Sequence, residues 1–325
     1  LWGKVMYEII VNPGSQSGKG LRNWEKAKSA FEKRNAEYRV HFTERNEDES
    51  AAALALYNEY MEKKEVLHLI VLGGDGTVND ILQVLPDFEN VSLSVIPSGS
   101  GNDLCRSLGI FGDIEEIAAH IIDNPITEKV DVGLVHSENS TLANRDISER
   151  RFLVSTGIGY DAAITEEVSV SDLKSLFNKL GVGRVVYLAV ALKQLVSMRH
   201  GTAHLTINDG KKTETIPLNR FLFVAGMNHK YEGGGFMFGG ADSSNTDGMI
   251  DICAVHGLSK AKVLQVIPQA KTGKHFKNKG VDHYRVSSYT VKTSTPMWIH
   301  TDGEVKLRAD YVSVSVMKKA LTLIY

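Results

Sequence analysis

A glycine-rich segment at residues 72–80, LGGDGTVND, constrains the fold of this chain more than any other feature. It follows an apolar run, residues 68–72, that has the length and composition of a buried strand, and a helical pattern continues after it through Leu85. A strand, a glycine turn and a helix N-terminus direct unpaired backbone N–H groups toward one point, which favours a phosphate. The segment therefore predicts an α/β nucleotide-binding fold.

Asp75 is the unexpected residue in this turn. A carboxylate beside a phosphate repels it unless a divalent cation lies between them, and Mg²⁺ is commonly held by one or two carboxylates together with substrate phosphates. The alternative is a sharp turn without a ligand, and the buried strand before GGDGT argues against it. We therefore expect Asp75 to organise Mg²⁺ near a nucleotide.

Two further loops follow the same logic. The strand pattern at 91–96 runs into the loop PSGSGND at 97–103 and then into a short helix, and the strand pattern at 5–11 runs into NPGSQSGKG at 12–20. The latter is not a Walker A loop, because three residues rather than four separate its glycines and Gly20 follows the lysine. A P-loop NTPase is thus disfavoured.

The periodicity of the chain changes near residue 129. Before it, strands at 5–11, 40–42, 68–72 and 91–96 alternate with helices; after it, ten strand patterns follow, with one clear helix at 182–198. We therefore expect an α/β plus all-β protein, because 325 residues exceed one ordinary domain. Residues 1–128 are the expected ATP-binding domain, with 307–325 a candidate last segment, and 129–306 form the expected β-sandwich-like domain, with a cleft between the two.

Composition narrows the class of protein. The net charge of −2 argues against a general nucleic-acid binder, and the two cysteines are too far apart for a CxxC pair, which favours a reducing cytoplasm. No apolar run is long enough to span a membrane, and the first residues lack a signal-type pattern. We also expect Cys105 to be a small buried hydrophobe rather than a reactive thiol.

The motifs together resemble the diacylglycerol kinase catalytic domain family over essentially the whole chain. The resemblance rests on their order and spacing: Asn-Pro at 12–13, GKG at 18–20, GGDGT at 73–77, GSGND at 99–103, KVDVG at 129–133, TDG at 246–248 and DGE at 302–304. GGDGT alone is shared with NAD kinases and 6-phosphofructokinases. The resemblance implies a soluble bacterial lipid kinase, with two domains like those of NAD kinase and diacylglycerol kinase.

The resemblance also implies roles for individual residues. It implies that Glu304 is the catalytic base, with Asp75 acting on Mg²⁺ through water. It implies that ATP is bound by Asn12, Pro13, Thr43, Gly73, Gly74, Asp75, Gly76, Thr77, Asn79 and Ser100. A second metal, Mg²⁺ or Ca²⁺, is implied at Ser244, Asp247 and Met249. An ordinary turn is the alternative at the last site.

The expected function is transfer of the γ-phosphoryl group of ATP, with Mg²⁺, to the hydroxyl of diacylglycerol or a related lipid alcohol. An NAD kinase and a non-catalytic nucleotide-sensing regulator are the alternatives. A lipid substrate requires a membrane surface, and residues 260–285 carry seven Lys and Arg against one Asp, so the protein is expected in the cytoplasm and reversibly on the inner face of the membrane. A solvated lysine-rich face is the alternative. A homodimer is a further expectation.

One motif is weak by itself. Residues 157–162, GIGYDA, mimic a dinucleotide-binding fingerprint, but they lie in the β-rich half, outside any βαβ context. The aromatic residues near Gly233, Gly234 and Gly235 are expected to be core rather than an acyl-chain groove.

Overall fold

The computed structural model describes residues 5–43, 49–141, 146–170, 193, 195 and 201–325. The chain divides into two compact units: residues 1–131 with 318–325, and residues 132–317. The helix predicted at 182–198 falls outside the described residues, except for Lys193 and Leu195, which are helical.

The first unit contains a parallel sheet. Its strands are β1 (Met6–Val11), β2 (Glu37–Phe42), β3 (Leu67–Gly73) and β4 (Val91–Pro97), in the order β2-β1-β3-β4. The end of β14 (Glu304–Ile324) adds a fifth parallel strand beside β4. β3 and β4 are almost completely buried, as expected for a sheet covered on both faces.

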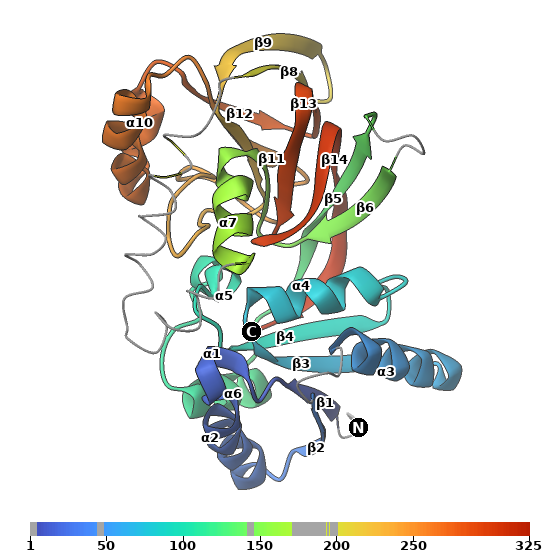
Figure 1. Ribbon diagram of the computed structural model, residues 1–325. Helices are drawn as coiled ribbons and strands as arrows, with labels where there is room; N and C mark the ends of the chain where they lie inside the picture. The colour runs from blue at the N-terminus through green and yellow to red at the C-terminus, as the bar shows by residue number, and fades with distance from the viewer. Residues whose placement is uncertain (1–4, 44–48, 142–145, 171–192, 194, 196–200) are drawn as a thin grey trace. The chain divides into compact units, whose positions relative to one another are not determined.

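Helices cover both faces of this sheet (Figure 1). On one face, α2 (Gly20–Lys33) and α6 (Ile114–Asp123) form an apolar core with the strands, in which Trp24 and Phe31 are buried. On the other face lie α3 (Glu49–Lys63) and α4 (Asp75–Val84). Two short helices, α1 (Ser15–Gly18) and α5 (Asp103–Ser107), follow β1 and β4.

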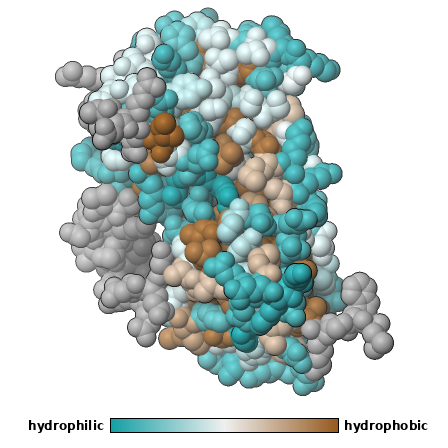
Figure 2. Space-filling view, turned by 90° about the vertical axis from the view of Figure 1, so that its right-hand side faces the viewer, coloured by the Kyte–Doolittle hydropathy of each residue, from teal (hydrophilic) through white to brown (hydrophobic). Residues whose placement is uncertain are grey.

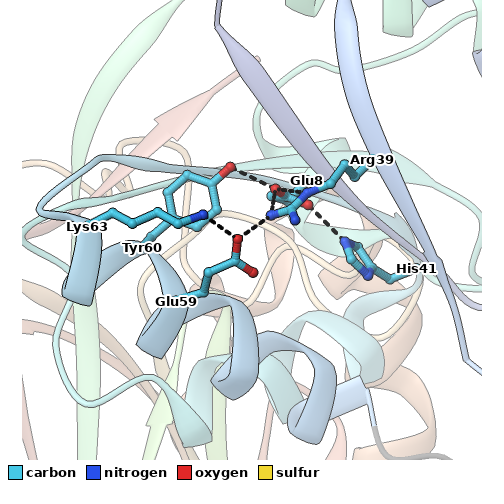
Figure 3. Close-up of polar contacts among 6 residues, drawn as sticks. All are labelled: Glu8, Arg39, His41, Glu59, Tyr60 and Lys63. Atoms are coloured by element: carbon cyan, nitrogen blue, oxygen red, sulfur yellow. Dashed lines mark hydrogen bonds and ion pairs between the residues drawn. The ribbon is translucent and has the colours of Figure 1, made fainter.

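A buried carboxylate fixes α3 to the sheet (Figure 3). Glu8 on β1 is inaccessible to solvent and contacts Arg39 and His41 on β2, the latter at 2.8 Å, and Tyr60 on α3 at 2.7 Å. Burial alone would raise the pKa of Glu8, but the hydrogen bonds from His41, Arg39 and Tyr60 outweigh burial and lower it to about 2.

The second unit consists mostly of antiparallel strands. The main sheet has the order β12-β11-β10-β7-β13-β14, with the hairpin β8–β9 paired to β13 and the hairpin β5–β6 paired to β14. The bounds not yet given are β5 (Thr127–Asn139), β6 (Asp146–Phe152), β7 (Ser155–Gly159), β8 (Gly201–Asn208), β9 (Thr213–Phe221), β10 (Phe223–Met227), β11 (Ile250–Val255), β12 (Val281–Val286) and β13 (Ser288–Thr301).

Helices and 3₁₀ turns pack against these strands. α7 (Tyr160–Val170) contacts β7 and β13, while α10 (Lys260–Val266), η1 (Ile267–Thr272) and η2 (Lys274–Lys277) follow β11. One apolar core joins β5, β7, β8, β13 and β14, with Phe152 and Phe221 fully buried, and a second lies under α10. The predicted α/β plus β-sandwich-like fold class is confirmed.

Several predicted strand boundaries are wrong. The predicted strand at 152–155 is divided by a bend at 153–154 between β6 and β7, and the one at 221–225 is divided at Leu222 between β9 and β10. The predicted strand at 284–293 is interrupted at Ser287, and those at 311–316 and 321–324 belong to the single strand β14. On the face shown in Figure 2, hydrophobic residues occur in separate patches among hydrophilic ones. Within the described ranges, every helix is too short or too polar to cross a membrane.

Candidate active site

The implied nucleotide-binding residues lie at the carboxyl ends of the parallel strands in the first unit. Asn12 and Pro13 follow β1, Thr43 follows β2, Gly73 ends β3, and the loop with Ser100 follows β4. In open α/β sheets this edge is where ligands bind, because the loops and helix N-termini converge there. The structure therefore brings these residues to one edge.

The two glycine loops interlock at Gly74 and Gly99. A Cβ atom on Gly74 would lie 2.9 Å from the Cα of Gly99, and one on Gly99 would lie 2.5 Å from the Cα of Gly74. The backbone N–H of Ser98 also donates to the carbonyl of Gly73 at 2.8 Å. Only glycine permits this approach, so the loops after β3 and β4 form one backbone surface.

Asp75 holds the second loop in place. Its carboxylate accepts the backbone N–H of Asp103 at 3.1 Å and that of Leu104 at 3.3 Å, which caps the first turn of α5. The sequence did not predict this contact. Mg²⁺ is commonly held by a carboxylate together with waters, so the chemistry of the Asp75 side chain fits Mg²⁺ held through water.

Side chains link the remaining loops to this edge. Ser98 contacts the hydroxyl of Ser15 at 2.7 Å and the amide of Asn23 at 2.9 Å, which joins the β4 loop to α1 and α2. Asn12 donates to Glu49 at the start of α3 at 2.6 Å. Asn79 is fully buried on α4, where its side-chain oxygen accepts the amide of Gln83 at 3.2 Å.

Glu304 is the first residue of β14, directly after a two-residue hairpin turn. Thr301 pairs with Glu304, and both turn residues have positive φ, 50° at Asp302 and 82° at Gly303. This is the type I′ geometry that Asp-Gly favours, because it matches the twist of the strands. The Glu304 side chain is 36% exposed, and Lys306 Nζ lies 3.9 Å from its carboxylate.

The carboxylate of Asp302 anchors this turn. It accepts the backbone N–H groups of Leu153 at 2.9 Å, Val154 at 2.8 Å and Ser155 at 3.0 Å. These bonds explain the bend between β6 and β7, since the three N–H groups turn toward Asp302 instead of a neighbouring strand. The conformation of the Asp-Gly-Glu motif is therefore fixed from outside the hairpin.

The predicted second metal site has a different environment. One oxygen of Asp247 accepts the backbone N–H of Met249 at 2.8 Å, and the other contacts the guanidinium of Arg285; Ser244 contacts Thr246 at 3.1 Å. The guanidinium of Arg285 therefore already pairs with the carboxylate that a metal ion would need. These side chains fit Mg²⁺ or Ca²⁺ poorly.

Sequence reasoning missed a charged cluster in the second unit. His300 on β13 is 2% exposed and lies 3.3 Å from Asp161 on α7 and 3.0 Å from Glu232 in the loop after β10. Burial lowers the pKa of His300, but the two carboxylates outweigh it and raise the pKa to about 10. These side chains are also metal-binding types whose ligand atoms lie within 4.8 Å of one another, and both carboxylates contact the same ring nitrogen, Nε2.

The signal for this cluster was present but weak. Asp161 belongs to the GIGYDA segment, and His300 precedes the Asp-Gly-Glu motif by two residues. Their meeting depends on the pairing of β7 with β13, which local patterns do not specify. The prediction for Cys105 is confirmed: the thiol is buried, and burial and the Asp75 carboxylate raise its pKa.

Comparison with known proteins agrees with this arrangement. The model of the "Diacylglycerol kinase catalytic domain" matches residues 7–135, and that of the "YegS C-terminal NAD kinase beta sandwich-like domain" matches residues 154–325. The chain belongs to the diacylglycerol kinase catalytic domain family. In this family, the YtlR protein of Bacillus subtilis (strain 168) is 28% identical over 91% of this chain and 92% of its own length.

Other members of the diacylglycerol kinase family are similar along most of the chain. A Bacillus subtilis (strain 168) protein named diacylglycerol kinase is 27% identical over 91% of this chain and 88% of its own. The crystal structure of a diacylglycerol kinase from Bacillus anthracis str. Sterne covers all of this chain and 98% of its own, with a TM-score of 0.64 and 20% identity. The fold also resembles yeast NADH kinase, with a TM-score of 0.52 and 10% identity over 99% of this chain and 84% of that one.

Proposed function

We propose that the protein is an ATP-dependent, Mg²⁺-requiring lipid kinase that phosphorylates the hydroxyl of diacylglycerol or a related lipid alcohol. The observation that carries the proposal is the interlocking of the loops after β3 and β4 through Gly74 and Gly99. Glycine-rich backbone at the carboxyl edge of a parallel sheet suits a polyphosphate. Relatives named diacylglycerol kinase support the choice of a lipid alcohol.

The chemistry divides between two carboxylates. Bound Mg²⁺ would neutralise charge on the phosphates, and Asp75 would hold it through water from its fixed position at the start of α4. Glu304 would accept the proton of the lipid hydroxyl, which needs an accessible carboxylate without strong partners. Its partial exposure and its 3.9 Å separation from Lys306 meet that requirement.

The central test uses labelled ATP, a panel of lipid alcohols, and NAD as a competing class of acceptor. Glu304→Gln should reduce kcat by about 10²- to 10⁴-fold and leave nucleotide binding unchanged, because general base catalysis contributes that much. Lys306→Gln is the matched control on the same strand and should retain activity. Normal turnover by Glu304→Gln would refute the base assignment. Phosphorylation of NAD alone would show an NAD kinase, and nucleotide binding without any phosphorylated product would show a regulator.

We further propose that the segment 260–279 attaches the enzyme to anionic membranes. Lys262, Lys274, Lys277 and Lys279 on and around α10 and η2 are exposed, and Leu264 on α10 is 47% exposed. Each basic group near an anionic surface contributes about 1 kcal/mol of attraction. Two cations of the predicted patch are engaged elsewhere: Arg285 contacts Asp247, and Lys271 lies 3.8 Å from the Phe236 ring centroid.

Vesicle binding tests this attachment separately from catalysis. Replacing Lys274, Lys277 and Lys279 by Glu should weaken sedimentation with anionic vesicles at low salt and leave turnover of a dispersed short-chain substrate intact. Lys211→Glu and Lys212→Glu, in the β8–β9 turn, provide a charge-reversal control outside this segment. Equal vesicle binding by the lysine variants and the wild type would rule out this surface.

A further inference from the structure

The turn that carries Glu304 adjoins an irregularity in the strand pairing. Thr301 pairs with Glu304 and His300 with Val305, but Ile299 pairs with Leu307, so Lys306 is an extra residue on β14. Such a β-bulge re-aims the side chains beside it, and a slip of one residue would turn Glu304 to the opposite face of the sheet. A defined direction for Glu304 therefore requires that this bulge be fixed in place.

His300 is the residue of β13 at which the register changes. Its side chain is 2% exposed and is less accessible than the two carboxylates beside it. It lies between Asp161 and Glu232, and the backbone N–H of Gly303, in the turn itself, points to its ring Nδ1 at 3.4 Å. Its carbonyl also accepts the hydroxyl of Thr156 at 2.7 Å. Both the backbone and the side chain of His300 are thus held.

The surrounding structure is shaped for this cluster. A Cβ atom on Gly157, which pairs with His300 across β7 and β13, would lie 1.9 Å from Asp161 Oδ2 and 2.4 Å from His300 Nε2. Glu232 is held by two backbone hydrogen bonds with Phe236, at 2.9 and 2.8 Å. A buried cation between two carboxylates is costly to move, because any displacement leaves charges unpaired.

From these contacts we propose that His300, locked between Asp161 and Glu232, is a positioning residue that pins the bulged β13–β14 register and so directs the carboxylate of Glu304. The inference rests on the proposed function, in which Glu304 is the base. Asp302 holds the turn from the side of β6 and β7, and the cluster holds it from the side of α7 and the loop after β10. The turn is therefore fixed at two separate points.

The first experiment separates positioning from folding. His300→Gln alone leaves two partly buried carboxylates, 18% and 13% exposed, without a cation and will destabilise the chain. The neutral triple variant D161N/E232Q/H300Q removes all three charges, and we expect it to fold and to bind ATP normally while kcat falls by roughly 10- to 100-fold, the cost of a displacement of about 1 Å. Wild-type kcat in a stable triple variant would overturn the proposal.

A matched control uses another histidine–carboxylate pair of the second unit. His256 lies 2.7 Å from Asp282, away from the Asp302–Gly303 turn, so His256→Gln should leave kcat unchanged. A loss of kcat in His256→Gln equal to that in the triple variant would show a general structural effect and refute the specific role. If Glu304→Gln is fully active, the base assignment on which this inference rests fails; if Glu304→Gln is inactive and the triple variant is fully active, only the positioning role fails.

The pH profile gives a readout that a purely structural role would not produce. Among the described titratable groups, the carboxylates of Asp161 and Glu232 are the charges that act on His300. Tyr289 and Cys253 nearby have raised pKa values and are neutral. The ring should therefore lose its proton, and kcat should fall, only near pH 10. Glu232→Gln removes one carboxylate that raises the pKa of His300, so its alkaline limb should move to lower pH. An unmoved limb would contradict the proposal.

Discussion

Replacement of Glu8 by Gln should cost stability in a way that depends on pH. The carboxylate is buried among Arg39, His41 and Tyr60 (Figure 3), and its pKa falls from 4.5 to about 2 on folding. A difference of this size contributes about 3 kcal/mol to the free energy of unfolding at pH 7. We therefore expect Glu8→Gln to be destabilised by about that amount at pH 7.

The sign of the pH dependence follows from the lowered pKa. The contribution is fully present above the unfolded pKa of 4.5 and is lost as pH falls toward 2, because the unfolded chain then binds the proton first. At pH 3 the difference between wild type and Glu8→Gln should shrink to about 1 kcal/mol. Urea unfolding followed by tryptophan fluorescence measures it. A background with Trp2→Phe and Trp298→Phe leaves Trp24, which is buried in the first unit, as the reporter.

Glu59→Gln is the matched control for this experiment. Glu59 also contacts Arg39, at 2.9 Å, but its side chain is 34% exposed, so Glu59→Gln should lose much less stability than Glu8→Gln. A loss for Glu8→Gln that is equal at pH 7 and pH 3 would refute the electrostatic explanation. Equal losses for Glu8→Gln and Glu59→Gln would refute the role of burial.

Two further changes test the glycine loops and the catalytic turn. Gly99→Ala places a Cβ 2.5 Å from the Cα of Gly74, so the loops must separate; ATP affinity measured by calorimetry should fall at least about tenfold, and unchanged affinity would contradict the interlocked surface. Asp302→Asn weakens the acceptor of three backbone N–H groups and should lower the free energy of unfolding, measured by urea unfolding, by about 2 kcal/mol. An unchanged free energy of unfolding would mean that these three bonds do not stabilise the turn.

Local sequence patterns were sufficient for the elements whose chemistry is local. The strand, glycine turn and helix at 67–84 follow from an apolar run, two glycines and a helical period. The carboxyl edge with Asn12 and Thr43 also follows, because parallel strands bring their ends together. These parts needed no knowledge of distant contacts.

The wrong boundaries arise where a distant side chain decides the backbone. The predicted strand at 152–155 fails because Asp302 takes three of its N–H groups. The break predicted in β14 near Lys318 is absent, because the strand continues from the second unit into the first. The N–H of Lys319, whose φ is 47°, donates to the buried Asp131 at 2.7 Å. The contact of Asp75 with α5, 28 residues away, was unpredictable for the same reason.

The acidic residues of the motifs therefore divide by what holds them. Asp75 and Asp302 accept backbone N–H groups from other segments, so their replacement disturbs a loop as well as any ligand it binds. Within the described part of the chain, Lys306 is the one charged residue that forms an ion pair with Glu304, at 3.9 Å. Replacement of Glu304 should therefore lower kcat with little change in stability. That contrast, measured as unfolding free energy beside kcat for the three variants, separates the proposed base from the residues that build the site around it.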